Sequence, residues 1–156
     1  MVYHLNNEMD TCPQHISKTA YYSIIFISQC IYVSIYYHYY LLTMLLSGLT
    51  VTSVCFWSDC SDMSLRYIDI TFAVTTLGVK SYIALTDFTP FYRSIWFTSL
   101  LISIGANYLN HKLIEYKDKL LIEDEKVHYM GTYIHMFFIH FLPTTTFSLC
   151  LILSIE

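Results

Sequence analysis

Long stretches without any charged side chain dominate this chain. Residues 19–57, 94–111 and 127–155 contain no Asp, Glu, Lys or Arg. About 20 consecutive apolar residues cross the hydrocarbon core of a bilayer as a helix. Only 13% of the residues are charged, against about 25% in an ordinary soluble domain. The sequence therefore predicts an integral membrane protein rather than a soluble globule.

The uncharged stretches divide into about five predicted transmembrane helices. Residues 19–57 are too many for one helix crossing a layer about 30 Å thick, and four tyrosines flank His38 in their middle, as is typical of a membrane interface. The runs are apolar on every side, which favours an all-α, polytopic helical bundle. The predicted spans are 19–36, 41–57, 67–86, 91–110 and a fifth that begins at Val127. Because a proline kinks a helix, Pro143 leaves two alternatives for the last stretch, one bent span or a span with a re-entrant tail, and four to six spans fit the sequence.

The charged residues are concentrated in one segment. We predict a single domain over 1–156, with a short polar amino-terminal segment (1–18) and a charged loop or short surface helix at 111–126. Lys and Arg favour the cytoplasmic side of a membrane. With five spans, Lys18, Arg66 and the lysines of 111–126 share one side, which leaves Arg93 on the other. The amino terminus and the 111–126 loop are therefore predicted to be cytoplasmic, in a membrane that the sequence does not identify.

The composition also limits the partners. The formal net charge of -4 offers no source for nucleic-acid binding, and the four glycines are too far apart to form a nucleotide-phosphate loop. The expected partners are the lipid bilayer and other membrane proteins or further copies of the chain. Gly48, Gly78 and the Gly105–Ala106 pair are predicted to lie at helix contacts, because small residues let helices approach closely. The tyrosine-rich composition is typical of an A/T-rich genome, such as that of a large DNA virus or a protist.

Two ionisable residues, Asp69 and Lys80, lie inside a predicted span. Ionisable residues within a membrane are costly and mark function by default. We expect Lys80, near the outer end of its helix, to extend its ammonium group toward water. For Asp69 the alternatives are a pair with Arg66 one turn away and a role in a site.

Histidines supply the other candidate ligands. His128 and His135 are seven residues apart and share one face of an α-helix, whereas His140 is rotated by about 140° from His135. We predict that Ser53, Asp69, His128 and His135 converge on a pocket that opens inward. Asp69, His128 and His135 are the candidate metal ligands, since zinc binds three such groups and a water molecule. Ser53 and Asp69 are the candidate catalytic residues, with Ser53 donating a hydrogen bond.

The same residues resemble a known family. The order of the segments 49–57 and 66–69, followed by His135, is similar to that in the membrane-hydrolase superfamily that includes alkaline ceramidases and the progestin and adiponectin receptors. Members carry a Ser and then a His at the end of an early span, an Asp near the start of the next, and a late His-x-x-x-His pair, and they bind zinc. The resemblance covers about a third of the chain and implies Asp69 and His135 as site residues, with Ser53 as the accompanying serine.

Two histidines of the family pattern are missing. Trp57 stands where the first histidine is expected, and Ile139 stands at the position of the partner of His135, with His140 one residue late. The family has seven spans rather than five.

Three functions follow from these observations. The first is a multi-pass membrane protein with a structural or interaction role, to which the sequence assigns no catalytic activity and for which no cofactor is expected, although zinc fits the alternative below. The alternative is a zinc-dependent hydrolase of lipid amides or esters. The second alternative is a channel or transporter subunit in which Lys80, Asn107 and the histidines line a path through an oligomer.

Overall fold

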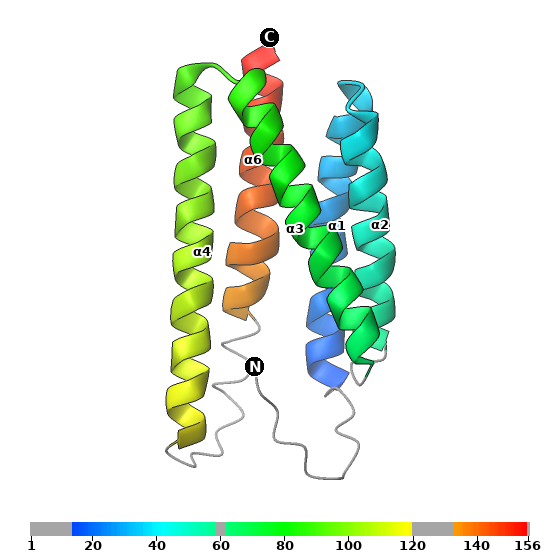
Figure 1. The fold of residues 1–156 in the computed structure, drawn as a ribbon, viewed down its shortest axis with the longest axis vertical. Helices are drawn as coiled ribbons and strands as arrows, with labels where there is room; N and C mark the ends of the chain where they lie inside the picture. The colour runs from blue at the N-terminus through cyan, green and yellow to red at the C-terminus, as the bar shows by residue number, and fades with distance from the viewer. Residues whose placement is uncertain (1–13, 59–61, 120–132, 156) are drawn as a thin grey trace.

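The chain folds into long helices that run up and down the molecule (Figure 1). The structure is a computed structural model that describes residues 14–58, 62–119 and 133–155. Within these ranges the regular structure is helical, as the sequence predicts. The helices are α1 (Gln14–Tyr36), α2 (Tyr40–Ser58), α3 (Met63–Thr86), α4 (Pro90–Lys119), the π-helix η1 (Met136–Phe141) and α6 (Leu142–Ile155).

A tight turn separates α1 from α2 at the predicted tyrosine-rich position. His38 adopts a positive φ of 62°, a left-handed conformation that non-glycine residues seldom take, and its Nδ1 lies 2.9 Å from the hydroxyl of Tyr40. The hydroxyl of Tyr39 donates to Asp87 Oδ2 at 2.5 Å, which ties this turn to the turn after α3. One end of the bundle therefore carries two turns that are bonded to each other.

The starts of α3 and α4 follow from local signals. Asp62 is the N-cap of α3, and its carboxylate accepts from the backbone N–H groups of Ser64 and Leu65. α4 begins at Pro90, and proline suits the first turn of a helix because its missing N–H has no helical partner there. Arg93 then donates to the carbonyl oxygens of Ala84 and Phe88, which satisfies acceptors that the end of α3 leaves free.

Each helix packs against a limited set of neighbours. α1 contacts α2 and α6, α2 contacts α3, and α4 contacts α6 and η1. α3 and α4 share a turn but diverge below it and touch little (Figure 1). The starts of α1 and α3 and the ends of α2 and α4 lie at one end of the bundle. Lys18 of α1 and Arg66 of α3 thus lie toward the same end as the last turns of α4.

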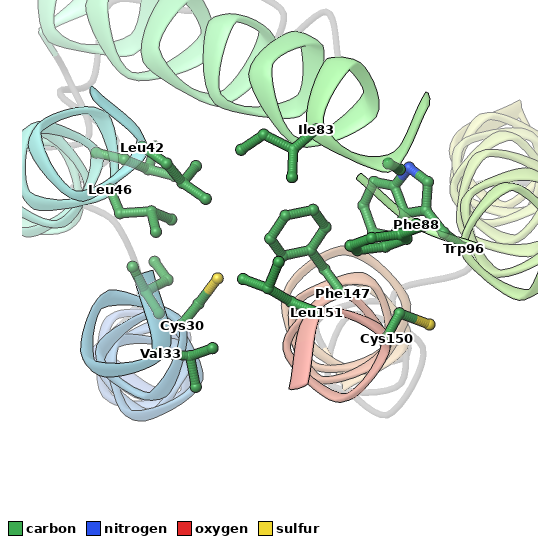
Figure 2. Packing of buried hydrophobic residues seen from close by; sticks show 13 residues of the cluster. Cys30, Val33, Leu42, Leu46, Ile83, Phe88, Trp96, Phe147, Cys150 and Leu151 are labelled. Atoms are coloured by element: carbon green, nitrogen blue, oxygen red, sulfur yellow. The ribbon is translucent and has the colours of Figure 1, made fainter. Parts of the chain in front are cut away.

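The core is centred on Phe147 of α6. This ring is fully buried, and Figure 2 shows it pointing toward the middle of the bundle, where Ile83 of α3 meets it. Trp96 of α4 packs edge-on against it at 5.3 Å between ring centroids, and Leu42 and Leu46 of α2 close the other side. Side chains of α2, α3, α4 and α6 therefore share one core, while the backbone of α6 lies against α1 and α4.

The predicted glycine contacts are confirmed at one position only. Gly48 faces Phe72 of α3 so closely that an added Cβ would overlap the ring. Gly78 and Gly105 have no atom within contact distance of such a Cβ, so the prediction that they pack against helices of this chain is wrong.

Three helices of the described residues are long and apolar enough to cross a membrane: Tyr40–Ser58, Met63–Thr86 and Tyr133–Ile155. The apolar part of α1, Tyr22–Tyr36, is shorter, and α4 does not qualify because Ser, Thr and Asn recur along it. α4 also continues to Lys119, so the first half of the predicted charged segment, 111–126, prolongs this helix.

Candidate functional site

Asp69 is held by two hydroxyl groups from the neighbouring helix. Ser53 Oγ donates to Asp69 Oδ1 at 2.6 Å, and Thr52 Oγ1 donates to the same oxygen at 3.0 Å. Ser53 is 2% exposed. α2 and α3 are antiparallel neighbours joined by a short connection, so residues about equally far from that connection meet. The structure thus brings Ser53 and Asp69 together, as the sequence-based pocket requires.

The alternative partner of Asp69 is not used. Arg66 lies one turn before Asp69 on α3, yet the recorded partners of the carboxylate are the two hydroxyls of α2. The predicted Asp69–Arg66 pair is therefore wrong. The hydroxyl groups of Ser53 and Thr52 take the place of Arg66 as partners of the carboxylate, because Asp69 faces α2.

His135 and His140 lie against each other, contrary to the sequence-based geometry. Their ring centroids are 5.2 Å apart with a T-shaped arrangement. The 140° rotation assumed a straight α-helix, but the segment between these residues is a π-helix. A π-helix closes its hydrogen bonds from residue i to residue i+5, so residues five apart lie nearly above one another. His140 is thus a neighbour of His135 that the sequence analysis missed.

Pro143 explains where the π-helix lies. Proline has no backbone N–H, and its ring clashes with the carbonyl group four residues earlier, here that of Ile139. The N–H of Leu142, the residue before the proline, donates to the carbonyl of Phe137, five residues back. The wider turn accommodates the ring, and Tyr133–Ile155 continues as one helical segment. The alternative of a span followed by a re-entrant tail does not occur in the described residues.

The two groups of polar side chains lie on different elements. Ser53, Thr52 and Asp69 join α2 to α3, whereas His135 and His140 form a ring pair in the segment 133–141. Both rings of the histidine pair are only partly exposed.

The predicted metal site is incomplete in the part of the chain that the structure describes. No three His, Cys, Asp or Glu side chains in these ranges are arranged to bind one metal ion. His128, the third predicted ligand, lies outside the described residues. The described residues thus supply two adjacent imidazoles on the segment 133–141 and, on α3, a carboxylate that already accepts two hydrogen bonds.

Lys80 does not extend toward water as predicted. It is 5% exposed, and its Nζ lies 5.4 Å from the ring centroid of Phe147. α3 turns this position toward the bundle, so the side chain is enclosed before it reaches the end of the helix. Asn107 is exposed on α4; the predicted path through an oligomer stays a prediction.

Comparison of the chain with protein-family models, curated proteins and solved structures finds no match.

Proposed function

We propose that this chain is a multi-pass integral membrane protein with five spans and a structural or interaction role. Its amino terminus and the 111–126 loop face the cytoplasm in this proposal. It acts through contacts with lipid and with other membrane proteins or further copies of itself.

The observation that carries the proposal is the outward apolar surface of every long helix. Large hydrophobic side chains point away from the bundle, among them Tyr32 of α1 (72% exposed), Met44 of α2 (72%), Val74 of α3 (64%), Leu101 of α4 (70%) and Leu149 of α6 (50%). A soluble monomer rarely exposes large contiguous apolar surfaces. Lipid is the environment in which this surface is stable.

The polar residues of α4 are compatible with a place in the bilayer. Ser94 donates to the carbonyl of Pro90, Ser99 to that of Trp96 and Ser103 to that of Ser99. Because these hydroxyls find acceptors within their own helix, they leave no free donor in a hydrocarbon environment. α4 is less apolar than the other long helices, and its packing against α6 and η1 helps to hold it in the bundle.

Membrane extraction and cysteine labelling test this proposal. We expect the protein to remain in the membrane after carbonate washing. In a cysteine-free background, a cysteine at Asp118 should react with an impermeant maleimide only after the cytoplasmic side is opened, whereas a cysteine at Thr89, in the turn at the opposite end, should react in intact cells. Release by carbonate, or labelling of both positions from the same side, would contradict the proposal.

One observation favours a second function, that of a zinc-dependent lipid hydrolase. The π-helix places the rings of His135 and His140 side by side. The two imidazoles are therefore neighbours, as in a His-x-x-x-His motif, although the spacing between them is one residue longer. Asp69 and Ser53, the other residues of the resemblance, are bonded to each other. A zinc site would need a third protein ligand, and His128 is the residue that the sequence offers for it.

Metal analysis of the purified protein distinguishes the two functions. A hydrolase site predicts about one zinc ion per chain, lost in His135→Ala and in His140→Ala. A His111→Ala variant is the matched control, since His111 lies on α4 and not in the segment that carries the histidine pair. Protein that is free of zinc after purification and does not take it up would leave the structural role as the function.

A further inference from the structure

A cavity of about 250 Å³ lies between α1 and α6, near the end of the bundle that carries the α1–α2 turn. Its lining side chains are Tyr32, Val33 and Tyr36 of α1, Tyr37 of the turn and Ile152 of α6. Figure 1 shows that α1 and α6 both end at this end of the molecule. The cavity is open to the outside of the bundle, so a ligand reaches it from the surface.

The three tyrosines are arranged as walls of this cavity. The ring centroids of Tyr36 and Tyr37 are 5.0 Å apart, and the two ring planes make an angle of 80°. Two rings at nearly a right angle present one face each to the corner between them. Tyr32 lies one turn before Tyr36 and shares its face of α1. Tyr37 packs against the buried core, which holds one of the walls in place.

The chemistry of the lining favours one class of ligand. None of the five lining side chains is charged, whereas a primary ammonium group or a phosphate needs hydrogen bonds or an opposite charge when it leaves water. A quaternary ammonium group has no N–H and spreads its charge over methyl groups, and aromatic side chains recognise it through their ring faces. Val33 and Ile152 complete the lining with apolar contacts for the methyl groups. The lining therefore matches a trimethylammonium group.

The position of the cavity indicates the source of such a group. Tyrosine is enriched where a span meets the lipid headgroups, and Tyr32 and Tyr36 are 72% and 67% exposed on the outward surface of α1. Ile25, two turns before Tyr32 on the same face, is also exposed. A phospholipid lying along α1 has its headgroup at the depth of the tyrosines and its acyl chains against side chains such as Ile25.

We propose that this tyrosine-lined cavity binds the choline headgroup of a membrane phospholipid, with the trimethylammonium group among the rings of Tyr32, Tyr36 and Tyr37. The inference rests on the proposed membrane insertion and names one lipid partner for the structural role. The two proposals fail separately. Carbonate washing tests insertion, whereas discrimination between lipid headgroups tests the cavity.

Native mass spectrometry of the detergent-solubilised protein measures this discrimination. The probes are phosphatidylcholine and phosphatidylethanolamine with the same acyl chains, together with the two lipids that carry one and two N-methyl groups. We expect affinity to rise with each methyl group, and phosphatidylcholine to bind at least about tenfold more tightly than phosphatidylethanolamine, because three ring contacts to the cation add. Equal affinities for the four lipids would overturn the proposal.

Variants of exposed tyrosines separate the ring contacts from general apolar packing. Tyr36→Leu keeps an apolar side chain but removes one ring, so it should weaken phosphatidylcholine binding about threefold, and Tyr32→Leu with Tyr36→Leu should weaken it about tenfold. Tyr36→Phe retains the ring and should bind like the parent. Tyr82→Leu is the matched control, since Tyr82 is also 67% exposed but lies on α3 and does not line the cavity.

The outcomes that contradict the proposal are distinct. Because the substituted tyrosines are largely exposed, the variants should fold, so unchanged phosphatidylcholine binding in the Tyr32→Leu, Tyr36→Leu protein would overturn it. Binding that is as weak in Tyr36→Phe as in Tyr36→Leu would also overturn it, since the hydroxyl group and not the ring would then carry the contact. A parent protein that binds none of the lipids and forms a dimer that Tyr36→Leu dissociates would assign the cavity to a second copy of the chain instead.

Discussion

The hydrogen bond between Ser53 and Asp69 gives the sharpest test of how the bundle is held together. A double-mutant cycle of Ser53→Ala and Asp69→Ala isolates the coupling energy of the pair. A hydrogen bond to a charged group contributes about 1.5–3 kcal/mol in water-soluble proteins, but hydrogen bonds between membrane helices average about 0.6 kcal/mol and reach about 1.7. The bond is 2.6 Å long, and Ser53 is almost completely buried. We therefore expect a coupling near the upper membrane value, about 1.5 kcal/mol.

Thr52 supplies an internal comparison. Its hydroxyl is 3.0 Å from the same carboxylate oxygen and also lies 3.1 Å from the carbonyl of Leu49, so it divides its interaction between two acceptors. The Thr52→Val and Asp69→Ala cycle should give a smaller coupling, about 0.5 kcal/mol. Arg66→Ala, the control for the discarded ion pair, should give no coupling with Asp69.

Unfolding in mixed micelles measures these energies. The helical circular dichroism of each variant is followed as the fraction of sodium dodecyl sulfate rises, and the free energies are compared at a common detergent composition. Non-additivity of distant sites is about 0.3–0.5 kcal/mol, so a coupling of about 1.5 kcal/mol is measurable. A Ser53 coupling within that error would refute the hydrogen bond between Ser53 and Asp69, and one smaller than the Thr52 coupling would refute Ser53 as the stronger donor.

Three further perturbations follow from single contacts. Gly48→Ala should destabilise the protein by about 1–3 kcal/mol, because the new methyl group overlaps Phe72; a Gly48→Ala, Phe72→Leu double variant that recovers no stability in detergent unfolding would contradict this. Burial, and then the hydrogen bond to Asp87 and its charge, raise the pKa of Tyr39 above its ordinary 10.0. The contribution of Tyr39 to the free energy of unfolding is therefore complete below about pH 10 and falls as the pH rises through the raised pKa. The free energy of unfolding of Tyr39→Phe should lack that alkaline decline. Identical pH profiles of the two proteins would argue against the link. His38→Val should cost about 1–2 kcal/mol at the left-handed turn, whereas His38→Gly should be tolerated; a valine variant as stable as the parent would exclude backbone strain there.

The sequence predicted the helices well where polar residues interrupt apolar runs. The tyrosine-rich break at His38 became the α1–α2 turn, and Asp87 and Pro90 bound the α3–α4 turn. Such breaks act locally, through capping groups and a proline, so one sequence contains them. The proximity of Ser53 and Asp69 was predictable for the same reason, since a short connection makes the two helices antiparallel neighbours.

The position of His140 could not be obtained from residue spacing. Counting at 100° per residue assumes an uninterrupted α-helix, and a single π-turn changes the face of every later residue. Pro143, three residues after His140, was the available signal, because it removes an N–H in the middle of an apolar helix. The burial of Lys80 was hidden for a different reason. α3 is apolar on most of its surface, so its sequence does not specify which face turns toward α6.

The two interior charges of α3 differ in a way that bears on their roles. Asp69, which the sequence singles out as a catalytic candidate, has both hydroxyl donors of α2 on one oxygen, as expected of a residue that fixes one helix against another. Lys80, which the sequence assigns to the membrane surface, is 5% exposed and lies over the ring of Phe147. A buried polar group with its hydrogen bonds made stabilises a fold without further partners. Asp69 is therefore the stronger candidate for a structural contact than for a catalytic group.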